Sequence, residues 1–352
     1  MAAPSKILVV RNDKLGDFML ALPALALLKQ HLPTTHISVV VPQYTREMAE
    51  ICPWVDAVIV DPGRIGSWSA YQAMIQQIRH GKFDAVLALF SSFRVGFAVW
   101  AAGIPQRLAP ATKVAQYFYN QRLVQRRSQS IKPEFEYNCD LVRHFLQSHD
   151  IALQGVEPTG PYLKFVAAEI ASAHERLAQV LGVDKHTQWV FIHPGSGGSA
   201  NNLTLAQYAE LAVRLSLPPQ ARVVITAGPT ERAQAEALRQ MLHLSGINVL
   251  VYHSTMGLRR FALNIASAAI FIGGSTGPLH IAGALDIPTA AFYPRGRTTS
   301  GLRWQTLNRP AHRLAFAPPQ PAAEDDMSAI DLSSAAAVIS GLIARTVTAK
   351  RN

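Results

Sequence analysis

The sequence predicts an α/β protein made of two doubly wound parallel sheets, each forming its own domain. Three observations predict this fold class. Strand-like and helical patterns alternate through most of the 352 residues. The strand-like runs are almost continuously apolar, as are strands covered on both faces of a parallel sheet. The alternation is interrupted at 150–165, a stretch rich in Gly and Pro that is typical of a linker, and then starts again.

In the first half, near-continuous apolar runs predict four strands, at 6–11, 36–41, 56–61 and 83–89. Helical patterns lie at 16–32 and 69–81. The apolar run 85–105 predicts a strand followed by a helix, because Arg94 interrupts it and Pro105 ends it. A less regular basic segment at about 105–133 precedes a helix at 134–149.

In the second half, the same pattern predicts five strands, at 188–194, 221–228, 248–253, 269–274 and 288–294. Helices are expected between them, at 203–215, 229–242 and 257–268. A Pro-rich stretch at 317–322 leads to a last helix at 333–346. We therefore expect two Rossmann-like domains, 1–160 and 161–325, with their functional residues just after the strands.

The composition is that of a globular protein, with 49% hydrophobic and 16% charged residues, and excludes a disordered chain. The two cysteines, Cys52 and Cys139, lie far apart and match no metal-ligand spacing, which favours a reducing compartment. The apolar run at the start is too short for a signal peptide. The sequence contains no run of about 18 purely apolar residues, so no membrane-spanning helix is predicted.

The formal net charge is +10 and is unevenly distributed. Between Asp84 and Glu134 the chain has seven basic residues and no acidic one. From 237 to 323 the only acid is Asp286, against eight arginines. Such surfaces favour a nucleotide, a nucleic acid or an acidic membrane, although any single arginine is more often part of a solvated face. Nucleic acid is the weakest candidate, because no zinc finger or aromatic RNA-binding pattern is present.

The segment GGSTGPLH joins a buried strand to a buried helix. Its small residues, Gly273 and Gly274, let a ligand approach the backbone, and Ser275, Thr276 and Gly277 stand at the start of the helix. A helix N-terminus presents unpaired N–H groups, which suit a phosphate. The alternative is a tight turn in which Ser275 or Thr276 is an N-cap.

Two further turns follow strands of the same domain. The first is HPGSGGSANN, with a backbone-donor loop and hydroxyls after the strand; its candidate residues are His193, Gly195, Ser196, Gly197, Gly198, Asn201 and Asn202. It matches neither a Walker loop nor G-x-G-x-x-G. The second is TAGPTE, where Glu231, after Gly228, is a candidate for binding ribose hydroxyls or simply a first-turn acid. Together the three turns predict a nucleotide-diphosphate site.

The first strand is followed by RNDKLGDF, in which Gly16 allows a sharp turn and Asp17 begins a helix. The carboxylate of Asp17 is either a general base or an ordinary N-terminal helix acid, and the stretch alone does not separate these roles.

Three stretches in this order resemble glycosyltransferase family 9, the heptosyltransferases of lipopolysaccharide core assembly and their relatives. They are GDFMLALPAL, FIHPGSGGSANNLTLAQYAEL and GGSTGPLHIAGALDIPTAAFYP. The resemblance implies the two-domain GT-B fold, with the domains facing a cleft and segment 326–352 packing back on the N-terminal domain. It implies an acceptor on the first domain, a nucleotide sugar on the second, and an inverting reaction without a cofactor or metal. The sequence has no D-x-D motif, in accord with that.

The resemblance implies that Asp17 is the general base, that the usual donor is ADP-L-glycero-D-manno-heptose, and that His280 lies near the phosphates. Two departures are visible. Asn201 or Asn202 stands where heptosyltransferases often have Lys, and Ser275 stands where they tend to have Asp. Arg295, Arg297 or Arg303 is a candidate to supply the missing positive charge.

We therefore predict a bacterial glycosyltransferase that transfers a sugar, with heptose as the first candidate, to lipopolysaccharide core or a lipid-linked acceptor. It is expected to be cytoplasmic and peripherally bound to the anionic inner membrane, with no nucleic-acid partner. The candidate residues for the acceptor or its charge are Lys14, Arg94, Arg122 and Arg126. The alternatives are the same fold with another nucleotide sugar for another glycan, and a non-catalytic nucleotide- or glycan-binding relative. An oxidoreductase is disfavoured by the missing dinucleotide motif.

Overall fold

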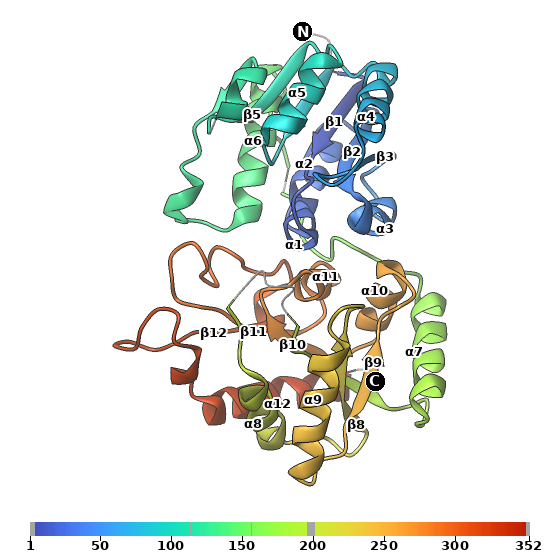
Figure 1. Ribbon diagram of the computed structural model, residues 1–352, viewed down its shortest axis with the longest axis vertical. Helices are drawn as coiled ribbons and strands as arrows, with labels where there is room; N and C mark the ends of the chain where they lie inside the picture. The colour runs from blue at the N-terminus through green and yellow to red at the C-terminus, as the bar shows by residue number, and fades with distance from the viewer. Residues whose placement is uncertain (1–3, 113, 156, 196–200, 350–352) are drawn as a thin grey trace. The chain divides into compact units, whose positions relative to one another are not determined.

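The structure is a computed structural model that describes residues 4–112, 114–155, 157–195 and 201–349. The chain divides into two compact units, Met1–Tyr162 and Leu163–Asn352 (Figure 1). This division falls within the stretch 150–165. Each unit contains one six-stranded sheet in which all strand pairs are parallel. The predicted α/β class with two doubly wound domains is confirmed.

The first sheet has the order β3-β2-β1-β4-β5-β6. Its strands are β1 Lys6–Val10, β2 His36–Pro42, β3 Ala57–Asp61, β4 Ala85–Ala88, β5 Gln106–Pro110 and β6 Gln121–Leu123. Four of these were predicted. The other two, β5 and β6, come from the basic segment that the sequence left irregular. Both are short, contain arginine and glutamine, and lack the apolar pattern of the other strands, and β6 is the edge strand of the sheet.

The helices of the first unit connect these strands. They are α1 Leu15–Met19, α2 Leu22–His31, α3 Arg46–Glu50, α4 Trp68–Gly81, α5 Phe93–Ala101 and α6 Glu134–Ser148. The predicted helix 16–32 is divided into α1 and α2, because Pro23 in the first turn of α2 has no N–H with which to continue the helix. Local signals start the next helices: the side chains of Ser67 and Ser92 accept hydrogen bonds at the N-termini of α4 and α5.

The second sheet repeats the first, with the order β12-β11-β10-β7-β8-β9. Its strands are β7 Gln188–His193, β8 Ala221–Ala227, β9 Leu250–His253, β10 Ile270–Gly274, β11 Thr289–Phe292 and β12 Arg313–Phe316. Read from β9 this is the strand order of the first unit, so the second unit repeats the topology of the first. β10, β7 and β8 are direct neighbours, and the turns that follow them therefore emerge at one edge of the sheet.

The helices of the second unit are α7 Ala167–Leu181, α8 Leu205–Arg214, α9 Arg232–Leu244, α10 Leu258–Ala266, α11 Gly277–Ala284 and α12 Leu332–Ala349. α7 was not predicted from the sequence; it ends at Gly182, which adopts φ 67°. The start of α8 is fixed by a capping box in which Thr204 and Gln207 bond each other's backbone N–H groups.

The last helix, α12, was expected to pack on the first domain. Its buried side chains instead belong to the apolar core of the second unit, and it packs against α8. Leu332, Ala335, Ile339, Leu342 and Ile343 recur at helical spacing and form the apolar face that is buried in this core. Among the described residues, α12 is also the one helix long and apolar enough to span a bilayer, by length and composition alone.

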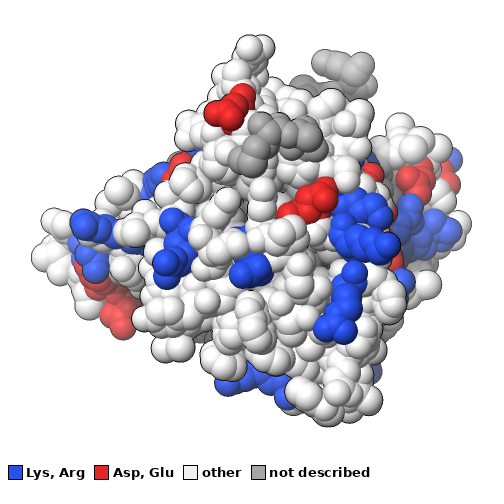
Figure 2. Space-filling view, turned by 90° about the horizontal axis from the view of Figure 1, so that it is seen from above, with Lys and Arg blue, Asp and Glu red and all other residues white. Residues whose placement is uncertain are grey.

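The surface is basic, as the net charge of +10 requires. On the face shown in Figure 2, Lys and Arg groups outnumber Asp and Glu groups. Both cysteines are buried, and burial raises the pKa of Cys52 to about 12. Its thiol is therefore an inert core group at neutral pH.

Candidate active site

Asp17 lies in α1, at the carboxyl edge of the first sheet, one turn after β1 ends. It is not an N-cap: that position belongs to Lys14, whose side chain makes no cap hydrogen bond. α1 buries Leu15, Phe18 and Met19 and leaves the Asp17 side chain partly accessible, at 13% exposure. The buried apolar side chains of α1 therefore fix this five-residue helix so that the Asp17 carboxylate lies near the surface.

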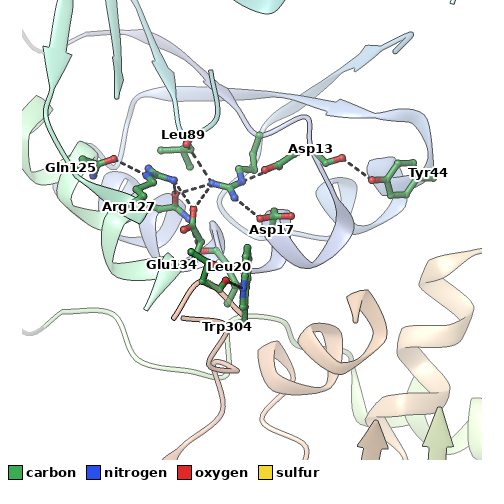
Figure 3. Close-up of polar contacts among 12 residues, drawn as sticks. Asp13, Asp17, Leu20, Tyr44, Leu89, Gln125, Arg127, Glu134 and Trp304 are labelled. Atoms are coloured by element: carbon green, nitrogen blue, oxygen red, sulfur yellow. Dashed lines mark hydrogen bonds and ion pairs between the residues drawn. The ribbon is translucent and has the colours of Figure 1, made fainter. Parts of the chain in front are cut away.

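The Asp17 carboxylate is held by Arg11, the residue that follows β1 (Figure 3). Arg11 Nη2 donates to Asp17 Oδ1 at 2.7 Å. Asp17 Oδ2 has no hydrogen-bond partner in the described part of the chain. A charge-assisted bond to a buried, immobile guanidinium fixes the orientation of the carboxylate and leaves its second oxygen available.

Arg11 is itself fully enclosed, with 3% of its side chain exposed. Its Nε bonds Asp13 Oδ1 at 3.0 Å, and its Nη1 bonds Glu134 Oε1 at 3.2 Å and Asn138 Oδ1 at 3.0 Å (Figure 3). A buried guanidinium is tolerated only when paired, and three carboxylates pair with this one. Burial is also the main cause that raises the pKa of Asp13 to about 6, against the lowering effect of Arg11.

Glu134, the first residue of α6, connects this network to the basic segment. Arg127 Nη1 bonds Glu134 Oε1 at 2.5 Å, from a single 3₁₀ turn, Arg127–Gln129. Arg126 and Ser130 on either side adopt φ of +44° and +48°. The basic segment is thus anchored to the carboxylate that holds Arg11, which in turn holds Asp17.

The four candidate acceptor residues do not contact one another through any hydrogen bond or ion pair of the described residues. Lys14, Arg122 and Arg126 are exposed, and none makes an ion pair among the described residues. Arg94 is different: its guanidinium pairs with the buried carboxylate of Asp61 and stacks over Tyr71 at 4.8 Å. Its charge is therefore already neutralised within the first unit.

In the second unit, the turns after β7 and β8 meet through Glu231. The backbone N–H of Gly228 donates to Glu231 Oε2 at 2.8 Å. A Cβ placed on Gly195 would lie 2.1 Å from Glu231 Oε1, so glycine is needed there for this close approach. His193 Nε2 lies 3.5 Å from Glu231 Oε2, and burial lowers the pKa of His193 despite that carboxylate.

The turns after β7 and β10 meet through Asn202. Its Oδ1 accepts from Tyr208 Oη at 2.7 Å and from the Leu203 N–H at 2.9 Å, and its Nδ2 donates to the Pro194 carbonyl at 3.2 Å. A Cβ on Gly274 would lie 2.5 Å from Asn202 Oδ1. Asn202 thus joins the two turns. Asn201 donates instead to the Asp325 carbonyl, at 2.8 Å.

The first turns of α11 carry buried polar side-chain atoms without a hydrogen-bond partner among the described residues. Thr276 is the N-cap residue, but its side chain makes no cap hydrogen bond. Thr276 Oγ1 and, one turn later, His280 Nδ1 are buried and have no partner among the described residues. Burial lowers the pKa of His280 to about 4, so its ring is neutral at physiological pH. Ser275 and Gly277 flank Thr276 and are partly exposed. Unpaired donors at a helix N-terminus form a suitable anion site.

Arg295 and Arg297 follow β11, the neighbour of β10, and so lie at the same edge of the sheet. Arg295 Nη2 donates to the Ala322 carbonyl at 2.5 Å, and its Nε is buried with no partner in the described chain. Arg297 is exposed. Ser196, Gly197 and Gly198 lie outside the described residues. Among those that are described, no group of three His, Cys, Asp or Glu is placed to hold a metal ion.

Sequence reasoning missed the residues that support Asp17. Arg11 is only six residues from Asp17, but nothing in the local pattern shows that its side chain is buried. Glu134 and Asn138 are more than a hundred residues away and reach Arg11 only through the packing of α6 against α2. An arginine directly after an apolar strand was the one available signal.

The chain matches the family model described as glycosyltransferase family 9 (heptosyltransferase) over residues 71–324. It is 45% identical over 314 residues to a Haemophilus influenzae protein described as a "Putative glycosyltransferase", covering 89% of each chain. It is 24% identical to lipooligosaccharide heptosyltransferase 2 of Campylobacter jejuni, covering 86% of each.

Two solved structures have the same fold at low identity. One is a family 9 glycosyl transferase from Veillonella parvula, at 16% identity and TM-score 0.80, covering 98% of this chain and 99% of that one. The other is the ADP-heptose lipopolysaccharide heptosyltransferase II of E. coli, at 19% identity and TM-score 0.77, with 97% and 99% covered.

Proposed function

Because this chain belongs to glycosyltransferase family 9, we propose that it transfers heptose from ADP-heptose to a hydroxyl group of lipopolysaccharide core. The enzyme class, glycosyltransferase, follows from the family. The donor and acceptor are the proposal, and the names of the Campylobacter and E. coli relatives support them. The observation that carries the catalytic part is a carboxylate, Asp17, fixed through one oxygen by buried Arg11 and available through the other.

The second unit would bind the donor at the edge where its three turns emerge. The buried Thr276 hydroxyl, which has no partner within the described chain, suits the pyrophosphate. So do the first N–H groups of α11, because these groups of a helix have no partner within the helix. Glu231 would accept hydrogen bonds from ribose hydroxyls beside Gly195 and Gly228. His280, neutral in this environment, would act as a hydrogen-bonding group and would not supply charge.

In the proposed reaction, Asp17 takes the proton of the acceptor hydroxyl as that oxygen attacks C1 of the donor sugar. The new C1–O bond forms on the face opposite the bond from C1 to the diphosphate oxygen, which breaks, and ADP leaves with the electron pair. The anomeric centre is inverted, and the transition state has oxocarbenium character. The role of Arg11 is to hold Asp17 in the position for proton transfer.

We further propose that the reaction needs no metal. The family resemblance supports this, as does the lack of a D-x-D motif in the sequence. The charge that develops on the leaving diphosphate would then be met by backbone N–H groups and arginine. Arg295, which has a buried unpartnered Nε, and exposed Arg297 are the arginines at that edge.

The second candidate is the same transferase chemistry with another nucleotide sugar. Asn201 or Asn202 stands where heptosyltransferases often have Lys. Asn202 is engaged in three hydrogen bonds within the turns, Asn201 donates to the Asp325 carbonyl, and neither brings a positive charge. This observation favours a donor site whose charge is arranged differently. We propose ADP-heptose first because the named relatives use heptose.

The acceptor would be a membrane glycolipid, and the protein would act at the cytoplasmic face of the inner membrane as a peripheral protein. The exposed basic residues of the first unit, Lys14, Arg122 and Arg126, would bind acidic groups of the acceptor.

A thermal-shift panel with ADP, UDP, GDP and CMP tests the donor proposal. A ligand that binds only the folded state raises the melting temperature with its concentration. ADP is expected to give the largest shift, and ADP-heptose is expected to support transfer to a heptose-deficient core. A larger shift with UDP, with transfer from a UDP-sugar, would establish the second candidate instead.

A further inference from the structure

The outer face of α5 carries an aromatic stripe that the proposed reaction does not use. Phe93, Phe97 and Trp100 follow one another at spacings of four and three residues and so share one face of the helix. Phe118, from the 3₁₀ helix η2 Val114–Phe118, packs against all three, with ring centroids 5.0, 6.0 and 6.2 Å apart. We call this area the α5–η2 surface.

Large apolar side chains on this surface are exposed to solvent. Phe93 is 62%, Trp100 52%, Val114 66% and Tyr117 77% exposed. The Phe118 ring packs closely on α5 at Gly96, where an added Cβ would lie 2.8 Å from Phe118 Cδ2. Phe93, Trp100 and Tyr117 nevertheless stay exposed. A contiguous exposed apolar patch of this kind marks an interaction site.

The charge around the patch has one sign. The segment 85–133, which contains α5 and η2, has no Asp or Glu. Arg107 donates to the carbonyls of Phe118 and Ile104, at the base of η2. Arg79 of α4 donates to the Ala101 carbonyl at the end of α5, at 2.8 Å. Both guanidinium groups therefore border the aromatic rings near the C-terminal end of α5. Each keeps its charge, because neither makes an ion pair in the described chain.

Aromatic rings bordered by arginines, without acids, are the composition of a membrane-interface surface. Tryptophan, tyrosine and phenylalanine partition into the headgroup region, and arginine binds lipid phosphates. A second copy of the chain fits less well, because an isologous contact would place the same arginines against one another. The charge therefore selects an anionic bilayer as the partner.

We infer that the α5–η2 surface docks the first unit on an anionic bilayer, with Phe93, Trp100 and Tyr117 entering the headgroup region and Arg79 and Arg107 at the lipid phosphates. The inference rests on the peripheral membrane association proposed above and names the surface that makes it. The aromatic side chains of this surface would add an apolar contribution to the electrostatic free energy of membrane binding. This docking does not depend on which sugar is transferred.

Vesicle co-sedimentation of the full chain tests the inference. Wild-type protein is expected to bind phosphatidylglycerol-containing vesicles, to bind phosphatidylcholine vesicles much less, and to lose binding as salt is raised. Trp100→Ser with Tyr117→Ser should weaken binding at least tenfold, and Arg79→Gln about fivefold. The matched controls are Leu244→Ser, 80% exposed on α9, and Arg239→Gln, 53% exposed, which should bind like wild type.

Two readouts keep the result independent of catalysis and of folding. ADP binding and transfer to a soluble acceptor should be unchanged in Trp100→Ser, so a failure of the donor proposal would leave the vesicle result intact. Brominated lipids should quench Trp100, and Trp100→Phe should lose that quenching while still binding vesicles. Equal binding by the serine variants and wild type, no quenching of Trp100, or a dimer that Trp100→Ser converts to monomer would overturn the inference.

Discussion

Arg11 Nη2 lies 2.7 Å from Asp17 Oδ1, and the same guanidinium also bonds the carboxylates of Asp13 and Glu134. The candidate base is therefore part of a buried ionic network and does not move independently. Residues from the loop after β1, from α1 and from α6 meet at one point of the first unit, where a single cation orients three anions.

Replacing Arg11 with Lys should lower kcat about ten- to a hundredfold while leaving donor affinity unchanged, because an ammonium cannot hold three carboxylates in fixed directions. The free energy of unfolding should fall by about 1–3 kcal/mol. The matched control is Arg46→Lys, because Arg46 forms an exposed ion pair with Glu50. This change should lower the free energy of unfolding by less than about 1 kcal/mol and leave activity unchanged. A kcat equal to wild type in Arg11→Lys would remove its positioning role.

Gly274→Ala should weaken donor binding and destabilise the second unit. The added Cβ would lie 2.5 Å from Asn202 Oδ1 and push the amide away from Tyr208 and Leu203, at a cost of about 1–3 kcal/mol. Gly341→Ala in α12 is the control, since its nearest contact would be Arg345 at 3.6 Å. That change should be neutral or stabilise by about 0.5–1 kcal/mol. Urea unfolding and ADP titration measure both effects.

The buried histidines should make the protein acid-sensitive. Burial lowers the pKa of His280 from 6.5 to about 4. Between these values the unfolded chain binds a proton that the folded chain does not, so stability is lost as pH falls from 6.5 toward 4. The loss from His280 alone is about 3 kcal/mol, and lowering of the His193 pKa by burial acts in the same direction.

Urea unfolding of wild type and His280→Gln at several pH values between 7 and 4 measures this effect. The variant should lose less stability over that range than wild type, whatever its stability at pH 7. Identical slopes in the two proteins would show that His280 titrates normally.

If Arg295 and Arg297 supply the charge of the donor site, replacing both with Ala should weaken ADP binding about tenfold and make it less sensitive to salt. Arg239→Ala, on the exposed face of α9, removes one charge away from the strand ends and serves as the control. Unchanged ADP affinity in the double variant would require another source of positive charge.

The sequence predicted the central strands and the order of the turns, because buried parallel strands have near-continuous apolar runs and glycine marks close approach. It left β5 and β6 irregular, because these short strands, at the edge of the sheet and next to it, contain polar residues such as Gln106 and Arg122. It placed α12 on the wrong unit, because periodicity shows that a helix has an apolar face but not which core that face enters.

The candidate site was also predicted only in part. Asp17 and Glu231 could be proposed from their positions after strands. Their partners could not, because the Arg11–Glu134 and His193–Glu231 contacts depend on packing between distant segments. The hydrogen bonds of Asn202 to Tyr208, Leu203 and Pro194 could not be predicted either, and its expected role in donor binding stays a prediction.

If Asp17 is the general base of a sugar transfer, Asp17→Asn should abolish proton transfer without changing the donor site. The amide keeps an oxygen for Arg11 but cannot accept the proton. Single-turnover transfer and ADP binding should be measured on the same preparation. The transfer rate should fall about a hundredfold or more, with ADP affinity within twofold of wild type. Transfer at the wild-type rate by Asp17→Asn would contradict this role of Asp17.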